Sequence, residues 1–466
     1  MLINFCHLLI KKYCLLISAI LIFVNNNCFA NFTETENIYS YKLLINSYLS
    51  NRNQSNIALQ NEYSKNEYSK NNYDKKYAVE NNSQLFLEAK KLINEQQSIS
   101  LKIKLESELS SNANNFRIDI DESFLLLENT LGNLELGATK ASNQKMKAGV
   151  TNINNSNNFA IANGNYLKNI ILPRFNSSAF VNNFSFPLFI TIPQLPIAHN
   201  GEGIGADFNE EIENGQYKTA NFNKDRIKIL RNTSFNGMED ANKISYYSPR
   251  ISNLQLAISY TPDSSKSYFS TSVFNNKNWR VVDITTLNAN YLNYLENDLS
   301  YELSASLENG RSKNNYQNNI KKRNLLAFDF GATANYFGFT LASNIGFWGN
   351  SLQNKNNNCD ITNLNLNLQN QDSLCSYRQN NFKPNYYALG LDYKISHFSL
   401  GISHFQSQLQ KNYYSADALN FGYKINKDIN LYLETINFSF KTKNIPNINL
   451  SKNKGCIALT GINLKF

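Results

Sequence analysis

Residues 98–109 read SISLKIKLESEL and alternate apolar and polar side chains with a period of two. One face of this segment carries Ile99, Leu101, Ile103, Leu105 and Leu109, and the other carries Ser100, Lys102, Lys104, Glu106 and Glu108. A period of two predicts a β-strand with one apolar face and one polar face in contact with water. In an open sheet the charged face is an ordinary solvated surface, whereas in a closed membrane barrel it lines the lumen.

The same pattern recurs along the chain and predicts sixteen strands. Their expected ranges are 37–50, 76–93, 98–110, 115–130, 132–141, 242–249, 253–262, 278–294, 297–309, 322–337, 338–349, 384–396, 397–409, 415–426, 428–441 and 454–466.

The connections between these strands alternate between long and short. The long ones are 51–75, 111–114, 142–241, 263–277, 310–321, 350–383, 410–414 and 442–453, and only the second and seventh of them are brief. Tight turns on one rim and long loops on the other are typical of antiparallel outer-membrane barrels, and an even strand number puts both ends of the barrel in the periplasm. The sequence therefore predicts an all-β, transmembrane antiparallel β-barrel of about sixteen strands.

Composition excludes several other classes of protein. The 466 residues are 42% hydrophobic, so the chain is not a disordered tail. A mean hydropathy of −0.43 excludes a bundle of membrane helices but not a barrel, because half of each barrel strand can be polar. The net charge of +9 is dispersed, with no Lys/Arg block longer than three residues, and we expect no nucleic-acid partner.

Residues 1–30 have the form of a secretory signal peptide. Lys11 and Lys12 precede an apolar run, 14–24, that is too short to cross a bilayer. Cys28 and Ala30 supply small residues for cleavage after Ala30, which leaves 31–466 as the mature barrel.

Two cysteines are predicted to form a disulfide in the sixth long loop. Cys359 and Cys375 bracket 15 residues of a polar loop, and an oxidising compartment permits the bond. In the chain-entropy model such a closure stabilises by about 3 kcal/mol. Non-reducing peptide mapping of the mature protein should recover the linked pair, and free thiols at both positions would contradict the prediction. Cys456 then has no predicted disulfide partner and is interpreted as a small apolar strand residue.

Three segments resemble the proteobacterial general porin family. The chain ends KGCIALTGINLKF, with Ile462, Leu464 and Phe466 on one face, like the C-terminal recognition signal of outer-membrane barrels. The segment TLGNLELGA (130–138) resembles the strand before that family's constriction loop. KISYYSPRISNLQLAISYTPD (243–263) resembles a hairpin of the family, with Asn253 where Gly is usual.

This resemblance implies a location and partners. It implies a sixteen-stranded homotrimer in the lipid of a Gram-negative outer membrane, assembled there by the barrel-assembly machinery and conducting small hydrophilic solutes and ions. It also implies a third loop folded into the lumen, and the third long connection, 142–241, is by far the longest.

In such a channel, acidic and basic groups on opposite walls of a constriction set ion preference. The acidic candidates on the long connection are Glu202, Asp207, Glu210, Glu211 and Glu213. The basic candidates are Lys42, Lys90, Lys102, Lys104 and Arg117 on early strands, with Arg226 and Arg231 returning from the loop. The apolar stretch 180–198 is expected to pack the loop against the inner wall.

No enzyme, cofactor or metal is expected. The chain shows no metal-ligand spacing, and Ser403 and His404 are adjacent strand residues that point to opposite faces. The alternatives to a diffusion porin are an outer-membrane adhesin or structural barrel closed by 142–241, a barrel hydrolase, and a soluble secreted β-protein.

Overall fold

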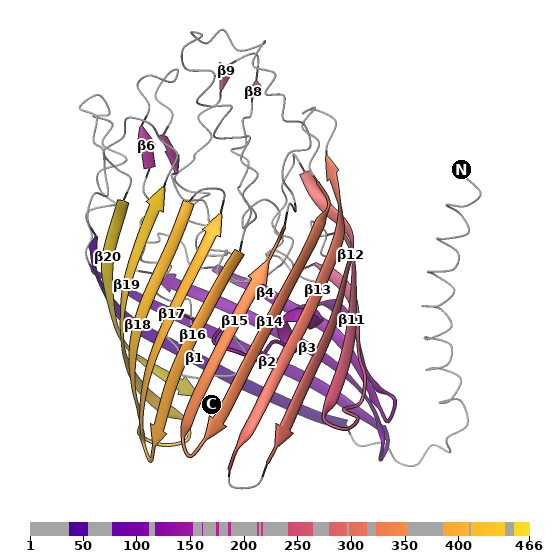
Figure 1. Cartoon of the computed structure of the whole chain (residues 1–466). Coiled ribbons are helices and arrows are strands. Elements are labelled where there is room, and N and C mark those ends of the chain that lie inside the picture. Colours follow the sequence, from indigo (N-terminus) through magenta and orange to yellow (C-terminus); the bar gives the residue numbers. More distant parts are fainter. Residues whose placement is uncertain are drawn as a thin grey trace.

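Sixteen antiparallel strands form one closed barrel in the computed structural model (Figure 1). The structure describes residues 37–54, 77–110, 117–151, 161, 174–176, 185–187, 212–213, 216–217, 241–263, 279–295, 298–314, 323–349, 351, 385–409, 412–442 and 452–466. The signal peptide and the predicted disulfide lie outside these residues and stay predictions.

The barrel strands follow the predicted ranges closely. They are β1 (Asn37–Gln54), β2 (Tyr77–Asn94), β3 (Gln97–Ser110), β4 (Arg117–Asn129), β5 (Gly132–Ala138), β10 (Asn242–Tyr247), β11 (Leu254–Asp263), β12 (Trp279–Tyr294), β13 (Ser300–Asn314), β14 (Leu325–Tyr336), β15 (Phe339–Phe347), β16 (Asn385–Ile395), β17 (Phe398–Leu409), β18 (Asn412–Lys424), β19 (Ile429–Thr442) and β20 (Lys452–Lys465). The prediction of sixteen strands is confirmed, with β1 and β13 each extending a few residues further than expected.

The connection between β5 and β10 contains further short elements. These are α3 (Ser142–Lys145), β6 (Arg174–Asn176), β7 (Ser185–Pro187), β8 (Ile212–Glu213) and β9 (Gln216–Tyr217). The pairs β6–β7 and β8–β9 form two separate two-stranded sheets outside the barrel sheet. Within the described residues no helix has both the length and the apolar character needed to cross a membrane.

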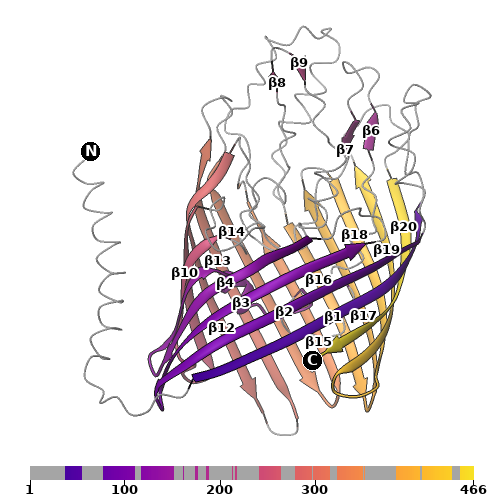
Figure 2. The same ribbon diagram turned by 180° about the vertical axis from the view of Figure 1, so that it is seen from behind.

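The barrel closes where the two ends of the chain meet. β20 pairs with β1 from Leu44↔Lys465 to Gln54↔Gly455. Phe466 extends this seam, because its amide donates to Leu43 O at 2.9 Å and its carbonyl accepts from Leu43 N at 3.0 Å. Viewed from behind, β1 to β4 cross the wall opposite the later strands, and the C-terminus lies near the lower part of the seam (Figure 2). Closure removes the unpaired strand edges that water would otherwise have to satisfy.

Side-chain alternation gives the wall two different faces. Large apolar residues on one face remain exposed, such as Leu101, Phe330 and Leu389 at 42, 47 and 53%. Their neighbours on the opposite face are largely buried and polar, as Ser100, Asp329 and Ser403 show. We call these the outward face and the inner face.

The turn between β10 and β11 explains the departure at Asn253. Ser252 and Asn253 have φ of 47° and 71°, the left-handed conformation that Gly adopts without cost and that Asn tolerates better than most residues. The Asn253 carbonyl accepts from Leu292 N at 3.0 Å and Arg250 Nη1 at 2.7 Å. Asn253 therefore holds a backbone conformation that Gly also adopts readily, which fits its place where the resembled hairpin usually has Gly.

Candidate functional site

The inner face of β2 to β5 carries paired charges. Lys90 Nζ lies 2.6 Å from Glu128 Oε2, Lys102 Nζ lies 3.3 Å from Glu88 Oε1, and Lys104 Nζ lies 2.5 Å from Asp121 Oδ2. A bulge in the β3–β4 register after Lys104 adds Asp121 as an extra residue in β4, and its side chain reaches Lys104. Each of these three predicted lysines therefore has a carboxylate neighbour on an adjacent strand or one strand further.

The other predicted bases are placed differently. Lys42 is exposed in β1, with its ammonium 5.5 Å from the centre of the Phe86 ring. Arg117 is paired through its backbone with Glu108, and its side chain lies outside the description, as do Arg226 and Arg231. The acidic candidates Glu202, Asp207, Glu210 and Glu211 also lie outside the described residues, and of Glu213 only its backbone position in β8 is described. Whether the two sets face each other stays a prediction.

The chain leaves β5 at Thr139 and runs along the inner face of the opposite strands. Its residues 139–151 are mostly buried. Hydrogen bonds tie this segment to β11, β13, β14 and β15. They are Ser142 N to Ser259 Oγ at 2.9 Å, Asn143 Nδ2 to Glu308 Oε2 at 3.0 Å, Ala148 N to Ser304 Oγ at 2.9 Å, Gly149 N to Thr333 Oγ1 at 2.9 Å, and Thr151 N to Asn344 Oδ1 at 2.9 Å. We call residues 139–151 the inner strap. Predicted strand 132–141 ends at Ala138 because the chain turns inward there.

The inner strap lies so close to the wall that one strand position has no room for a side chain. A Cβ at Gly331 in β14 would overlap the carbonyl oxygen of Ala148. That same carbonyl accepts from Asn344 Nδ2 at 2.6 Å. Backbone and wall are therefore in direct contact, as expected where glycine interrupts a strand pattern.

One buried ion pair anchors the strap to β14. Lys147 Nζ lies 2.8 Å from Asp329 Oδ2, and both side chains are almost fully buried, at 2 and 3% exposure. The Tyr386 hydroxyl donates to the same carboxylate oxygen and accepts from Lys147. Burial lowers the pKa of the Lys147 ammonium, and the neighbouring Asp329 acts in the opposite direction. The sequence analysis missed all three residues, although Lys140, Lys145 and Lys147 form a basic run at the start of the long connection.

The inner face of the later strands carries a series of buried aromatic side chains. Ring centres of neighbouring residues lie 5.8 to 6.1 Å apart along the series Trp348, Tyr386, Phe405 and Tyr414. Each of these four side chains is at most 4% exposed. Ile436, Phe438, Ile457 and Leu459 continue this buried apolar surface toward the seam. The interior therefore combines the ion pairs of β2 to β4 with a buried aromatic and apolar surface on the later strands, where buried Asp392 and Glu434 also lie.

The hydrolase alternative finds no support at the suspected pair. Ser403 is buried on the inner face, whereas His404 faces outward, with its Nδ1 2.6 Å from Asp417 Oδ1. Within the described ranges, no three His, Cys, Asp or Glu side chains are grouped so as to hold a metal ion.

Comparisons with known proteins agree with this architecture. A family model described as Gram-negative porin matches residues 55–443. An uncharacterised protein of Rickettsia bellii (strain RML369-C) is 27% identical over 270 residues, which are 49% of this chain and 57% of that protein. The chain thus matches little more than half the length of this relative.

Solved structures of porins match this chain at low sequence identity. The anion-selective porin from Comamonas acidovorans is 12% identical, with 92% of this chain and all of that chain covered, and a TM-score of 0.50. Salmonella typhi OmpF is 11% identical, with 93 and 97% covered and a TM-score of 0.49. The family match spans most of the sequence and, together with the closed barrel, indicates the outer membrane: the chain belongs to the Gram-negative porin family.

Proposed function

We propose that this porin forms a water-filled channel for the passive diffusion of small hydrophilic solutes and ions. The observation that carries the proposal is a closed barrel whose inner face bears ionised side chains along β2 to β5. Charged groups need water, so this half of the lumen is hydrated. The charges act on passing ions through their field.

The long connection is the proposed constriction. The inner strap supports this, because the first residues of the connection already lie within the barrel and are bonded to its far wall. We propose that more of 142–241 enters the lumen and that Glu202, Asp207, Glu210, Glu211 and Glu213 line its narrowest part. Two unit charges about 4 Å apart interact by about 1 to 4 kcal/mol as the effective dielectric falls from 80 to 20, which is enough to alter ion preference.

Ion selectivity tests this assignment. Neutralising Glu210, Glu211 and Glu213 to Gln should shift the reversal potential of single channels in a salt gradient toward anion preference. The shift should shrink at high salt, once the Debye length falls below about 8 Å. Lys102→Gln with Lys104→Gln should move it in the opposite direction. An unchanged reversal potential in the triple variant, with normal insertion and conductance, would put the acidic cluster outside the constriction.

A closed barrel, serving as a surface or structural protein, is the second candidate. The buried aromatic series from Trp348 to Tyr414 favours it, because these side chains leave almost no surface exposed to a channel. The two candidates differ in planar bilayers: a channel gives stable open steps, and a closed barrel gives none.

We propose a homotrimer held in outer-membrane lipid. A hydrogen-bonded polar group on the outward face of β1 and β2 supports contact between copies: Asn81 Nδ2 donates to Ser47 Oγ at 2.9 Å, and Ser83 Oγ donates to Asn81 Oδ1 at 2.8 Å. Exposed Leu49 and Val79 lie beside this group. Polar groups facing acyl chains are unfavourable, whereas a subunit contact accommodates them.

A further inference from the structure

The inner strap crosses three neighbouring pairs of polar residues on the inner face of β12 and β13. The strand register pairs Thr286 with Glu308, Asn288 with Ser306, and Asn290 with Ser304. All six belong to the inner face, because they alternate with exposed apolar residues such as Leu287 and Leu303, each 47% exposed. We call these six residues the polar platform.

Hydrogen bonds hold the strap to the two outer pairs of the polar platform. They are Ser142 Oγ with Thr286 Oγ1 at 2.9 Å, Asn143 Nδ2 to Glu308 Oε2 at 3.0 Å, Asn290 Nδ2 to Met146 O at 2.9 Å, and Ala148 N to Ser304 Oγ at 2.9 Å. The first two bonds lie at one end of the platform, and the last two lie at the other end. The strap therefore spans the middle pair, Asn288 and Ser306.

Several buried polar atoms at and beside this middle pair make no hydrogen bond within the part of the chain that the structure describes. They are Asn143 Oδ1, Gln144 Nε2, Asn288 Oδ1 and Ser306 Oγ. Asn143, Gln144 and Asn288 are only 4, 5 and 6% exposed. A buried polar atom without a partner is unfavourable, and such atoms are few in native proteins. Their grouping between the strap and the wall indicates a bound hydrophilic ligand.

We propose that the inner strap and the polar platform hold a calcium ion between them. Asn143, Asn288 and Ser306 supply amide and hydroxyl oxygens, which Ca²⁺ accepts as ligands together with carboxylates and water. The Glu308 carboxylate is the next inner-face group after Ser306 on β13 and already contacts the Asn143 amide. A metal ion beside Glu308 also favours the burial of this carboxylate, which is 0% exposed.

Gln144 is compatible with a cation at this position. No hydrogen bond to a described residue holds its amide in place. A turn of the amide group therefore brings Oε1 to the position of Nε2, and Oε1 is an acceptor of the same kind as the two Asn oxygens.

The set of ligands favours calcium over other metals. Imidazole and thiolate groups, which zinc and copper prefer, are absent from the strap and the polar platform. The oxygens come from three separate elements, which suits the flexible coordination of Ca²⁺ better than the strict octahedron of Mg²⁺. Because Glu308 is the one carboxylate among these ligands, we expect a weak site with a Kd of roughly 0.1 to 1 mM.

Local sequence patterns could not indicate this site. Its ligands come from position 143 and from positions 288 to 308, and most of them are amides or hydroxyls instead of acidic, His or Cys side chains. Calcium binding here does not depend on where the acidic cluster of the long connection lies. It can therefore be tested separately from ion selectivity.

Equilibrium dialysis of the full mature protein with radioactive calcium, in excess magnesium, tests the proposal. We expect Ser306→Ala with Asn288→Leu, which removes two ligand oxygens, to weaken calcium binding by about tenfold or more. Ser306→Asp adds a carboxylate at the same position and should tighten binding by about tenfold. Ser403→Ala changes a buried inner-face serine of β17, and this matched control should bind calcium as the unaltered protein does.

Hydrogen exchange of the strap shows where the calcium binds and needs no variant. Calcium should slow the exchange of peptides that cover residues 142–149 several-fold relative to magnesium. The Ser403→Ala protein should respond in the same way, and the Ser306→Ala, Asn288→Leu protein should not respond.

Three outcomes would overturn the proposal. They are equal calcium affinity in the double variant and the unaltered protein, a calcium affinity of Ser306→Asp no higher than that of the unaltered protein, and strap exchange that does not respond to calcium. The last would assign the buried polar atoms to ordered water only.

Discussion

Deleting Phe466, or replacing it with Ser, is expected to reduce the amount of folded barrel in the outer membrane by roughly tenfold or more. The terminal aromatic belongs to the strand that must close against β1, and a barrel that fails to close exposes two strand edges. Phe466 is the last residue of the β1–β20 seam, bonded at both its amide and its carbonyl to Leu43. Its ring is 65% exposed on the same outward face as Ile462 and Leu464, where the assembly machinery is proposed to recognise the terminal strand.

The two Phe466 variants distinguish the contribution of the hydrogen bonds with Leu43 from that of the terminal aromatic ring, which is the expected recognition signal. The deletion removes the two hydrogen bonds with Leu43, whereas Phe466→Ser keeps the backbone and removes only the aromatic ring. Export across the inner membrane should continue in both. The measurement is the heat-modifiable fraction in purified outer membranes. Phe337→Ser is the matched control, since Phe337 is 59% exposed in the β14–β15 turn and takes no part in the seam. Normal levels of heat-modifiable Phe466→Ser would show that the terminal ring is dispensable.

Replacing Lys147 with Met is expected to destabilise the barrel by about 3 to 5 kcal/mol, because it leaves the Asp329 carboxylate buried without its cation. The pair is 2.8 Å apart and almost fully buried, and it joins the inner strap to the far wall. Removing both charges in Lys147→Met with Asp329→Leu should restore most of the loss, since a buried ion pair is often no better than apolar packing.

Denaturant unfolding of the refolded protein measures this difference, and current noise in single channels reports on the freedom of the strap. Lys90→Met is the matched control: the Lys90–Glu128 pair is 29 and 34% exposed, so its loss should cost about 1 kcal/mol or less. If Lys147→Met is no more destabilising than Lys90→Met, the buried pair does not hold the strap.

Local patterns were sufficient to predict most of the barrel. The alternation in 98–109 correctly assigns Lys102 and Lys104 to the inner face, because successive side chains of a strand point to opposite sides. The same period locates all sixteen strands, and their alternating long and short connections indicate an antiparallel meander. Asn253 adopts a positive φ, so it can occupy the turn position where the resembled motif usually has Gly.

Contacts between residues far apart in the sequence could not be predicted in this way. Lys147 and Asp329 are separated by 182 positions, and nothing in either local segment indicates that they meet. The partners of Lys90, Lys102 and Lys104 were missed for a related reason: the register between strands, including the bulge that adds Asp121, decides which carboxylate lies within reach. The basic residues of the early strands therefore lie beside carboxylates that the local pattern did not indicate.

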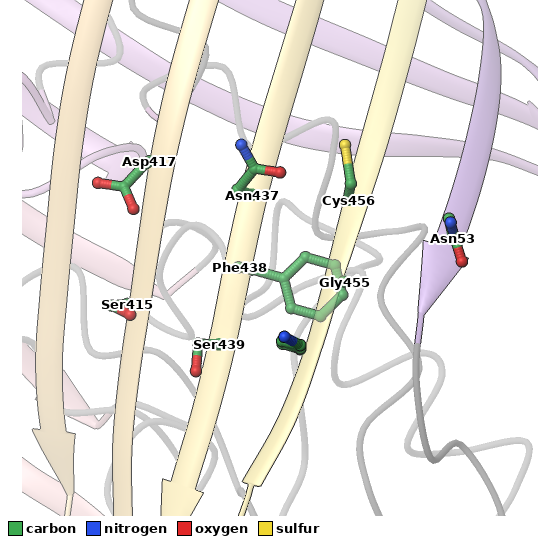
Figure 3. A pocket seen from close by; sticks show the side chains of 9 residues that line it. Asn53, Ser415, Asp417, Asn437, Phe438, Ser439, Gly455 and Cys456 are labelled. Atoms are coloured by element: carbon green, nitrogen blue, oxygen red, sulfur yellow. The ribbon is translucent and has the colours of Figure 1, made fainter.

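The sequence by itself determined the strands, their two faces and the order in which they pair, since these depend on alternation and on connection length, which are local properties. Only the tertiary structure decided what fills and surrounds the barrel. Closure brings β5, β14 and β16 around one interior, where the inner strap, Asp329 and Tyr386 meet. Closure also brings β20 beside β1. Polar outward residues such as Asp417, Asn437 and Asn53 then lie in one row across neighbouring strands (Figure 3), and their grouping depends on register and not on any one stretch of sequence.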